Sequence, residues 1–120
     1  MDRKVLLREY KESRRPMGVY RVVNRVNGKG LVGSSVNVPA MLNRHQAQLK
    51  MGAHQNRALQ ADWKQFGAEA FEFEVLDTLE PTDQPDYDPA GDLHALEEMW
   101  LEKLSPFEEH GYNARPKQRA

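Results

Sequence analysis

The sequence predicts an α+β domain with several helices and a small, mostly antiparallel sheet. Three observations favour this class. A valine-rich hairpin pattern comes early in the chain, one strand with clean alternation lies near its middle, and several segments have apolar residues at helical spacing. At 120 residues the chain has the length of one domain, so we treat 1–120 as a single unit with a core over about 17–114.

The amino-terminal part predicts a helix followed by a hairpin. Residues 2–13 are highly charged and have a narrow apolar stripe, which is typical of a short surface helix. Residues 18–24 and 30–34 predict two strands. Asn27 and Gly28 between them are a strong signal for a tight turn, because both residue types tolerate a positive φ.

The middle of the chain predicts two helices and a third strand. We expect one helix over 38–50, with Asn37 as its cap, and another over 54–66, which Gly67 ends. Residues 70–77 alternate between apolar and acidic side chains, so a half-buried strand is expected there. Its inward face would carry Phe71, Phe73 and Val75.

The carboxy-terminal part predicts a loop, a helix and a tail. Residues 80–92 are rich in proline and aspartate and are not expected to form regular structure. Residues 93–104 predict a helix, and the chain ends in a turn and a basic tail.

Net charge is −1, but the charges are unevenly distributed. Residues 1–50 contain eleven Lys and Arg against three acids, whereas residues 51–120 contain six against fifteen. Two interpretations stay open: a basic face that attracts phosphates, or two halves that neutralise one another in the fold.

Composition also excludes several classes of protein. The chain has no cysteine, so it has neither a disulfide framework nor a thiolate metal site. It shows no signal-peptide pattern and no apolar run of about 20 residues, so we expect a cytoplasmic protein with no membrane partner.

Three polar side chains fall on faces that periodicity turns inward. Glu97 lies in the apolar stripe of the helix over 93–104, His45 in that of the helix over 38–50, and Tyr20 on a strand face. A carboxylate on a packing face is costly unless a cation or metal pairs with it. Each also has an ordinary interpretation, as a stripe-edge acid that reaches water, a hydrogen-bonded core histidine or a packed tyrosine ring. They are candidates for one shared site.

Several short motifs, in order along the chain, resemble those of the GIY-YIG nucleases. The resemblance covers roughly 17–114, and its motifs are in register over that length. They are GVY at 18–20, LVGSS at 31–35, NRHQ around His45, Glu97 three residues before Trp100, and GYN at 111–113.

The resemblance implies a three-stranded antiparallel sheet, over 18–24, 30–34 and 70–77, flanked by helices. It also implies metal-dependent hydrolysis of a nucleic-acid phosphodiester, with DNA as the expected substrate. It assigns Glu97 as the carboxylate ligand of Mg²⁺ or Mn²⁺ and Tyr20 as the base that activates water, with His45 as the alternative base. A free tyrosine has a pKa of about 10, so we expect Arg44 or Lys29 to lower it. Arg44 is the further expected catalytic residue, as a contact to the phosphate. Nucleic-acid contacts are expected from Lys29, Ser34, Ser35, His54 and Asn113.

Two positions depart from the family pattern. Leu31, in the triplet Leu31-Val32-Gly33, replaces its second tyrosine, and Met41 replaces a helical arginine. These departures favour a second hypothesis, a nucleic-acid-binding module of the same fold with weak or no cleavage. A third is a protein-interaction domain that uses the loop 80–92 or the helix over 93–104. The chain has no length for a separate DNA-targeting domain, so specificity is weak or comes from a homodimer or a separate targeting protein.

Overall fold

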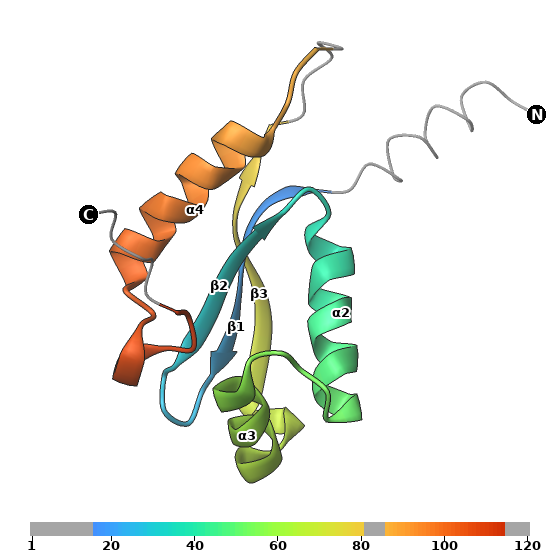
Figure 1. Ribbon diagram of the computed structural model, residues 1–120, viewed down its shortest axis with the longest axis vertical. Coiled ribbons are helices and arrows are strands. Elements are labelled where there is room, and N and C mark those ends of the chain that lie inside the picture. The colour runs from blue at the N-terminus through green and yellow to red at the C-terminus, as the bar shows by residue number, and fades with distance from the viewer. Residues whose placement is uncertain (1–15, 81–85, 115–120) are drawn as a thin grey trace, which may run out of the picture.

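The computed structural model describes residues 16–80 and 86–114 and has the α+β architecture that the sequence predicts (Figure 1). Its antiparallel strands form one sheet in the order β2-β1-β3. The strands are β1 (Met17–Asn24), β2 (Gly30–Ser35) and β3 (Phe71–Leu79). The helices are α2 (Val38–Met51), α3 (Arg57–Phe66) and α4 (Ala90–Leu104), with short 3-10 turns η1 (Ala68–Ala70) and η2 (Glu108–His110). The expected helix over 2–13, part of the loop 80–92 and most of the basic tail lie outside the described residues.

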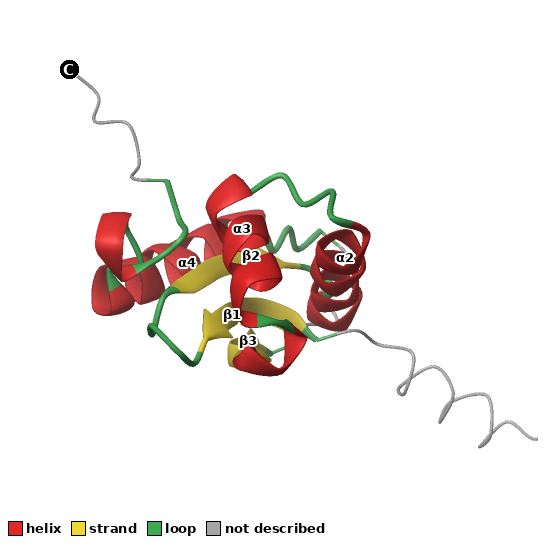
Figure 2. Ribbon diagram, turned by 90° about the horizontal axis from the view of Figure 1, so that it is seen from below, coloured by secondary structure: helices red, strands yellow, loops and turns green. Residues whose placement is uncertain are grey.

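The helices lie on both sides of the sheet. α2 and α3 cover one face, and α4 crosses the other, as Figures 1 and 2 show from two directions. None of the helices in the described ranges has both the length and the apolar character needed to cross a bilayer.

The predicted hairpin turn is confirmed. Gly28 has a φ of 79°, and its N–H donates to the carbonyl of Asn24 at 2.7 Å. The Lys29 N–H donates to the side-chain oxygen of Asn27 at 2.9 Å, which closes the turn. A positive φ is favourable for glycine because it has no Cβ, so the local sequence fixes where the strands reverse.

Capping side chains decide where the helices start. The Asn37 side chain accepts from the Ala40 N–H at 3.1 Å, which confirms the predicted cap of α2. The expected start of the next helix at 54 is wrong, because Asn56 caps α3 by accepting from the Leu59 N–H at 3.0 Å. α4 begins at Ala90 rather than 93, so its first turn occupies the end of the expected loop.

The core lies between the sheet and the helices α2 and α3. Its central cluster of buried side chains comes from one strand, both helices and the carboxy-terminal segment, and it consists of Val22, Leu49, Leu59, Trp63 and Tyr112. Phe71 and Phe73 pack against them, with Trp63 in edge and tilted contact with both rings. The inward face predicted for the third strand is therefore confirmed for its two phenylalanines.

The same prediction is wrong for Val75, which is 47% exposed. Tyr20 pairs with Val75 and Val19 pairs with Asp77, so β3 contains one extra residue at this point, a β-bulge. The bulge interrupts the alternation and turns Asp77 toward α4, where its carboxylate accepts from the Trp100 ring N–H at 3.1 Å. Val75, on the outer strand of the sheet, stays accessible to solvent.

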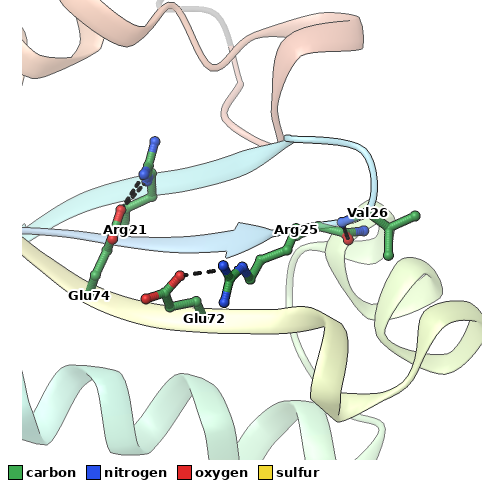
Figure 3. Close-up of polar contacts among 6 residues, drawn as sticks. Arg21, Arg25, Val26, Glu72 and Glu74 are labelled. Atoms are coloured by element: carbon green, nitrogen blue, oxygen red, sulfur yellow. Dashed lines mark hydrogen bonds and ion pairs between the residues drawn. The ribbon is translucent and has the colours of Figure 1, made fainter.

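Cross-strand ion pairs join the basic and acidic parts of the chain (Figure 3). Arg21 of β1 pairs with Glu74 of β3, and Arg25 pairs with Glu72 at 3.7 Å. Part of the basic charge of the first fifty residues is thus neutralised within the fold, as one of the two sequence interpretations predicts.

The segment after α4 closes the outer edge of β2. The Tyr112 N–H donates to the Gly30 carbonyl at 2.8 Å. The Asn113 amide makes two further hydrogen bonds of 2.8 Å, accepting from the N–H and donating to the carbonyl of Val32. This segment satisfies backbone groups that an open edge strand would expose.

We expect Leu59→Ala to lower the free energy of unfolding by about 2–5 kcal/mol, because Leu59 is fully buried and its removal leaves a cavity. Met51→Ala is the control, since Met51 is 79% exposed and its loss should change stability by no more than about 0.5 kcal/mol. Urea unfolding of both variants measures the difference. Equal effects would contradict this description of the core.

Candidate active site

Tyr20 is held against the surface of its neighbouring strand. It lies on central strand β1, is 6% exposed, and pairs with Gly33 of β2. A Cβ added to Gly33 would lie 2.5 Å from the Tyr20 hydroxyl oxygen and 2.7 Å from the ring carbon that carries it. Gly33 is therefore required here for the close approach of the phenol, and not for a positive φ.

The Tyr20 hydroxyl reaches α2 and begins a line of three rings. It lies 2.9 Å from Nε2 of His45. The other His45 nitrogen, Nδ1, lies 2.8 Å from Nε2 of His54, whose ring stacks on it with centroids 5.0 Å apart. His54 belongs to the connection between α2 and α3, so three elements bring these rings together.

Burial and neighbouring charges shift the pKa of each ring. Burial, followed by His54 and Arg44, lowers the pKa of His45 to about 4, and burial also lowers that of His54. Both imidazoles are therefore neutral at pH 7. Burial, followed by the charge of Glu97, raises the pKa of Tyr20 to about 12. The expectation that Arg44 or Lys29 lowers the pKa of Tyr20 is wrong.

Glu97 approaches β2 from the opposite face. It lies on α4, is half-buried, and accepts from the Ser34 hydroxyl at 3.2 Å. With Ser34, Ser35, Asp88 and His94 it lines an open cleft of about 450 Å³ between the end of β2 and the start of α4. Because its charge raises the pKa of Tyr20, the carboxylate and the phenol are electrostatically linked even though they belong to opposite faces.

The structure thus brings Tyr20, His45 and His54 together and places Glu97 beside Ser34. Arg44 is exposed on α2 next to His45. The remaining candidates have other positions.

Lys29 lies in the hairpin turn, where its N–H bonds to Asn27, and Asn113 has both its amide atoms on Val32. Sequence reasoning missed Asp88 and His94, which line the cleft. His94 lies in the first turns of α4, and Asp88 lies two residues before this helix begins.

The two departures from the nuclease pattern are both half-buried residues. Leu31 packs against the core that contains Val22, with which it pairs across the strands. Met41 is half-buried on α2. The position of the family's second tyrosine therefore contributes to packing in this chain.

Comparisons with known proteins place this fold. No protein-family model matches the chain, and no curated protein matches it. Among solved structures, the chain is similar to the catalytic domain of the intron endonuclease I-TevI carrying a glutamate-to-alanine substitution, with 26% identity, 82% of this chain and 92% of that chain covered, and a TM-score of 0.67. It is also similar to the catalytic domain of the homing endonuclease I-TevI, with 27% identity, 83% and 99% covered, and a TM-score of 0.66.

The fold is that of a GIY-YIG endonuclease catalytic domain. These structural neighbours confirm the resemblance to the GIY-YIG nuclease superfamily that the motifs predict.

Gly33→Ala should displace the phenol and break the hydrogen bond between Tyr20 and His45, at a cost of about 1–3 kcal/mol in stability from overpacking. NMR of the His45 ring and chemical unfolding measure the two effects. Gly91→Ala is the control, because a Cβ at Gly91 meets nothing within 4 Å. An unchanged His45 environment in the Gly33 variant would contradict the close contact.

Stability should fall as pH falls from about 6.5 to about 4, because the unfolded state binds protons in this range that His45 does not accept in the fold. The His45 contribution is on the order of 1 kcal/mol, since its ring is half-exposed and water screens the effect. Thermal denaturation from about pH 3 to about pH 8 measures it, because this range brackets both pKa values. His45→Gln should flatten the profile, and an unchanged slope would count against a depressed pKa.

Proposed function

We propose that this chain is a metal-dependent endonuclease that hydrolyses phosphodiester bonds in nucleic acid, with DNA as the substrate. The observation that carries the proposal is that two reactive groups contact adjacent residues of β2. The Tyr20 phenol lies against Gly33, and the Glu97 carboxylate accepts a hydrogen bond from Ser34. Similarity to an endonuclease catalytic domain supports it. A proton-transferring pair and an acidic metal ligand in one site are groups that phosphodiester hydrolysis uses.

Each side chain has a part in the reaction. The oxygen of a water bonds to phosphorus, the bond from phosphorus to the leaving sugar oxygen breaks, and that oxygen takes a proton from solvent. The proton of the attacking water passes to the pair formed by Tyr20 and His45, whose atoms lie 2.9 Å apart. Arg44, exposed beside His45, contacts the phosphate.

Glu97 is the residue that would hold the divalent ion. It accepts one hydrogen bond, from Ser34, and the salt bridges found in the described ranges do not include it. Across those ranges no three His, Cys, Asp or Glu side chains are grouped to hold a metal. One carboxylate beside a hydroxyl fits Mg²⁺ or Mn²⁺, which keep several waters and bind substrate phosphate. When bound, the ion supplies charge stabilisation at the phosphate.

The charges of the helices suit an anionic substrate. α2 contains Arg44 and Lys50 and no acidic residue, whereas α4 contains four acids and one lysine. Nucleic acid therefore approaches over α2, and a cation at Glu97 offsets the negative side of the site. Ser34, Ser35 and His54 belong to this region. Lys29 in the hairpin turn and Asn113 at the edge of β2 are further proposed contacts to nucleic acid.

A second candidate is a nucleic-acid-binding module with little or no turnover. The apolar surroundings of Leu31 and the methionine at position 41 favour it, because a tyrosine and a cation of the family pattern are replaced. Salt-sensitive binding without cleavage is its signature. In either case a homodimer or a separate targeting protein would supply sequence specificity, and the cytoplasm would be the compartment.

Glu97→Gln should reduce DNA cleavage in Mg²⁺ or Mn²⁺ by about 10²-fold or more, because the amide is uncharged and binds the ion poorly. The amide oxygen can still accept from Ser34, so the fold should persist. Cleavage of single- and double-stranded DNA is measured with each metal and with a chelator.

The matched control is Glu102→Gln, which makes the same charge change at an exposed position of α4. It should retain a cleavage rate within about threefold of wild type, because substitutions at exposed positions usually have small effects on the fold. Cleavage that survives in the Glu97 variant would overturn the proposal. Salt-sensitive binding with no cleavage by the wild type would favour the second candidate.

A further inference from the structure

The line of rings from Tyr20 ends at a backbone N–H donor. This donor fixes the donor-to-acceptor direction of every hydrogen bond along the line. The Asn56 N–H donates to Nδ1 of His54 at 3.0 Å. A backbone amide has no acceptor at nitrogen, so Nδ1 of His54 must carry a lone pair. The His54 ring is neutral, and its proton is therefore on Nε2.

The assignment continues along the chain of rings. Nε2 of His54 lies 2.8 Å from Nδ1 of His45, so the proton on His54 is donated to His45. His45 Nδ1 then carries a lone pair, and its own proton is on Nε2, 2.9 Å from the Tyr20 hydroxyl oxygen. All three hydrogen bonds point toward Tyr20. The hydroxyl proton of Tyr20 is consequently free to point into the site.

The opposite direction is incompatible with the backbone. If Tyr20 donated to His45, His45 would donate to His54, and His54 would carry a proton on Nδ1 facing the Asn56 N–H. Two donors would then meet at 3.0 Å, with loss of a hydrogen bond to a ring that is 9% exposed. Protonation of either imidazole creates the same conflict.

The backbone donor itself is held in place by several contacts. The Asn56 side chain accepts from Leu59 at the start of α3 and donates to the Tyr112 carbonyl at 2.6 Å. The His54 N–H donates to the side chain of buried Gln60, which in turn donates to the Leu49 carbonyl. The connection between α2 and α3 therefore has little freedom to turn the Asn56 amide away.

We propose that His54 is a positioning residue that fixes the tautomer of His45, so that His45 donates to Tyr20 and Tyr20, rather than His45, faces the attacking water. The catalytic part rests on the proposed nuclease function, whereas the tautomers do not. A donor at the phenol oxygen stabilises the phenolate, which opposes the effects of burial and of Glu97. Tyr20 first releases its hydroxyl proton to solvent. The phenolate oxygen then takes the proton of the attacking water, and His45 keeps its own.

NMR of wild-type protein labelled with ¹⁵N in histidine tests the tautomers at pH 7 without any activity. We expect His45 and His54 each to have a protonated Nε2 and an unprotonated Nδ1. His94 and His110, whose side chains are each 70% exposed, are identified by His94→Gln and His110→Gln. A proton on Nδ1 of His45 or of His54 would overturn the proposal.

Two variants separate positioning from packing. His54→Gln keeps an amide N–H that can donate to His45, whereas His54→Leu removes the donor. We expect the leucine variant to lose the single His45 tautomer and to lower kcat by about 10-fold or more with little change in KM. The glutamine variant should keep the tautomer and remain within about threefold of wild type. A leucine variant with the wild-type His45 tautomer would overturn the proposal, and inactivity of the wild type would overturn the nuclease function alone.

Discussion

The Tyr20 phenol lies against the backbone of Gly33, where a single added Cβ would come within 2.5 Å of its hydroxyl oxygen. This contact lets a side chain of the central strand pass over its neighbour and reach His45 on α2. A tyrosine inside a tight hairpin is thus explained by its packing: the ring is buried, and its oxygen reaches a polar partner. The position of Tyr20 in the first triplet therefore depends on Gly33 in the second triplet having no side chain.

Features that depend on local sequence were predictable. The turn at Asn27 and Gly28 and the cap at Asn37 follow from residues that are close neighbours in the chain. Glu97 and His45 could be selected as candidates because helical periodicity placed them among apolar residues. The order of the family motifs along the chain supported these candidates, and the resemblance predicted the three-stranded sheet correctly.

Features that depend on contacts between distant segments were not predictable. The bulge in β3 turns Asp77 toward Trp100, and the alternation of apolar and polar residues does not indicate such a bulge. The tautomers depend on the Asn56 amide, a backbone group without a signature of its own. The Asn113 amide has the residue type expected of a phosphate contact, but it binds the edge of β2 instead. In each case the tertiary partner decides the role of the residue.

The site forms where both faces of one edge strand are within reach. Gly33 and Ser34 are adjacent, so their side-chain positions point to opposite faces, toward Tyr20 and Glu97 respectively. The carboxy-terminal segment covers the edge of β2 at Gly30 and at Val32, and Ser34 follows them at the cleft. Under the proposed function, this end of the strand is where a phosphate would bind. Closure of the rest of the edge keeps another strand from pairing there.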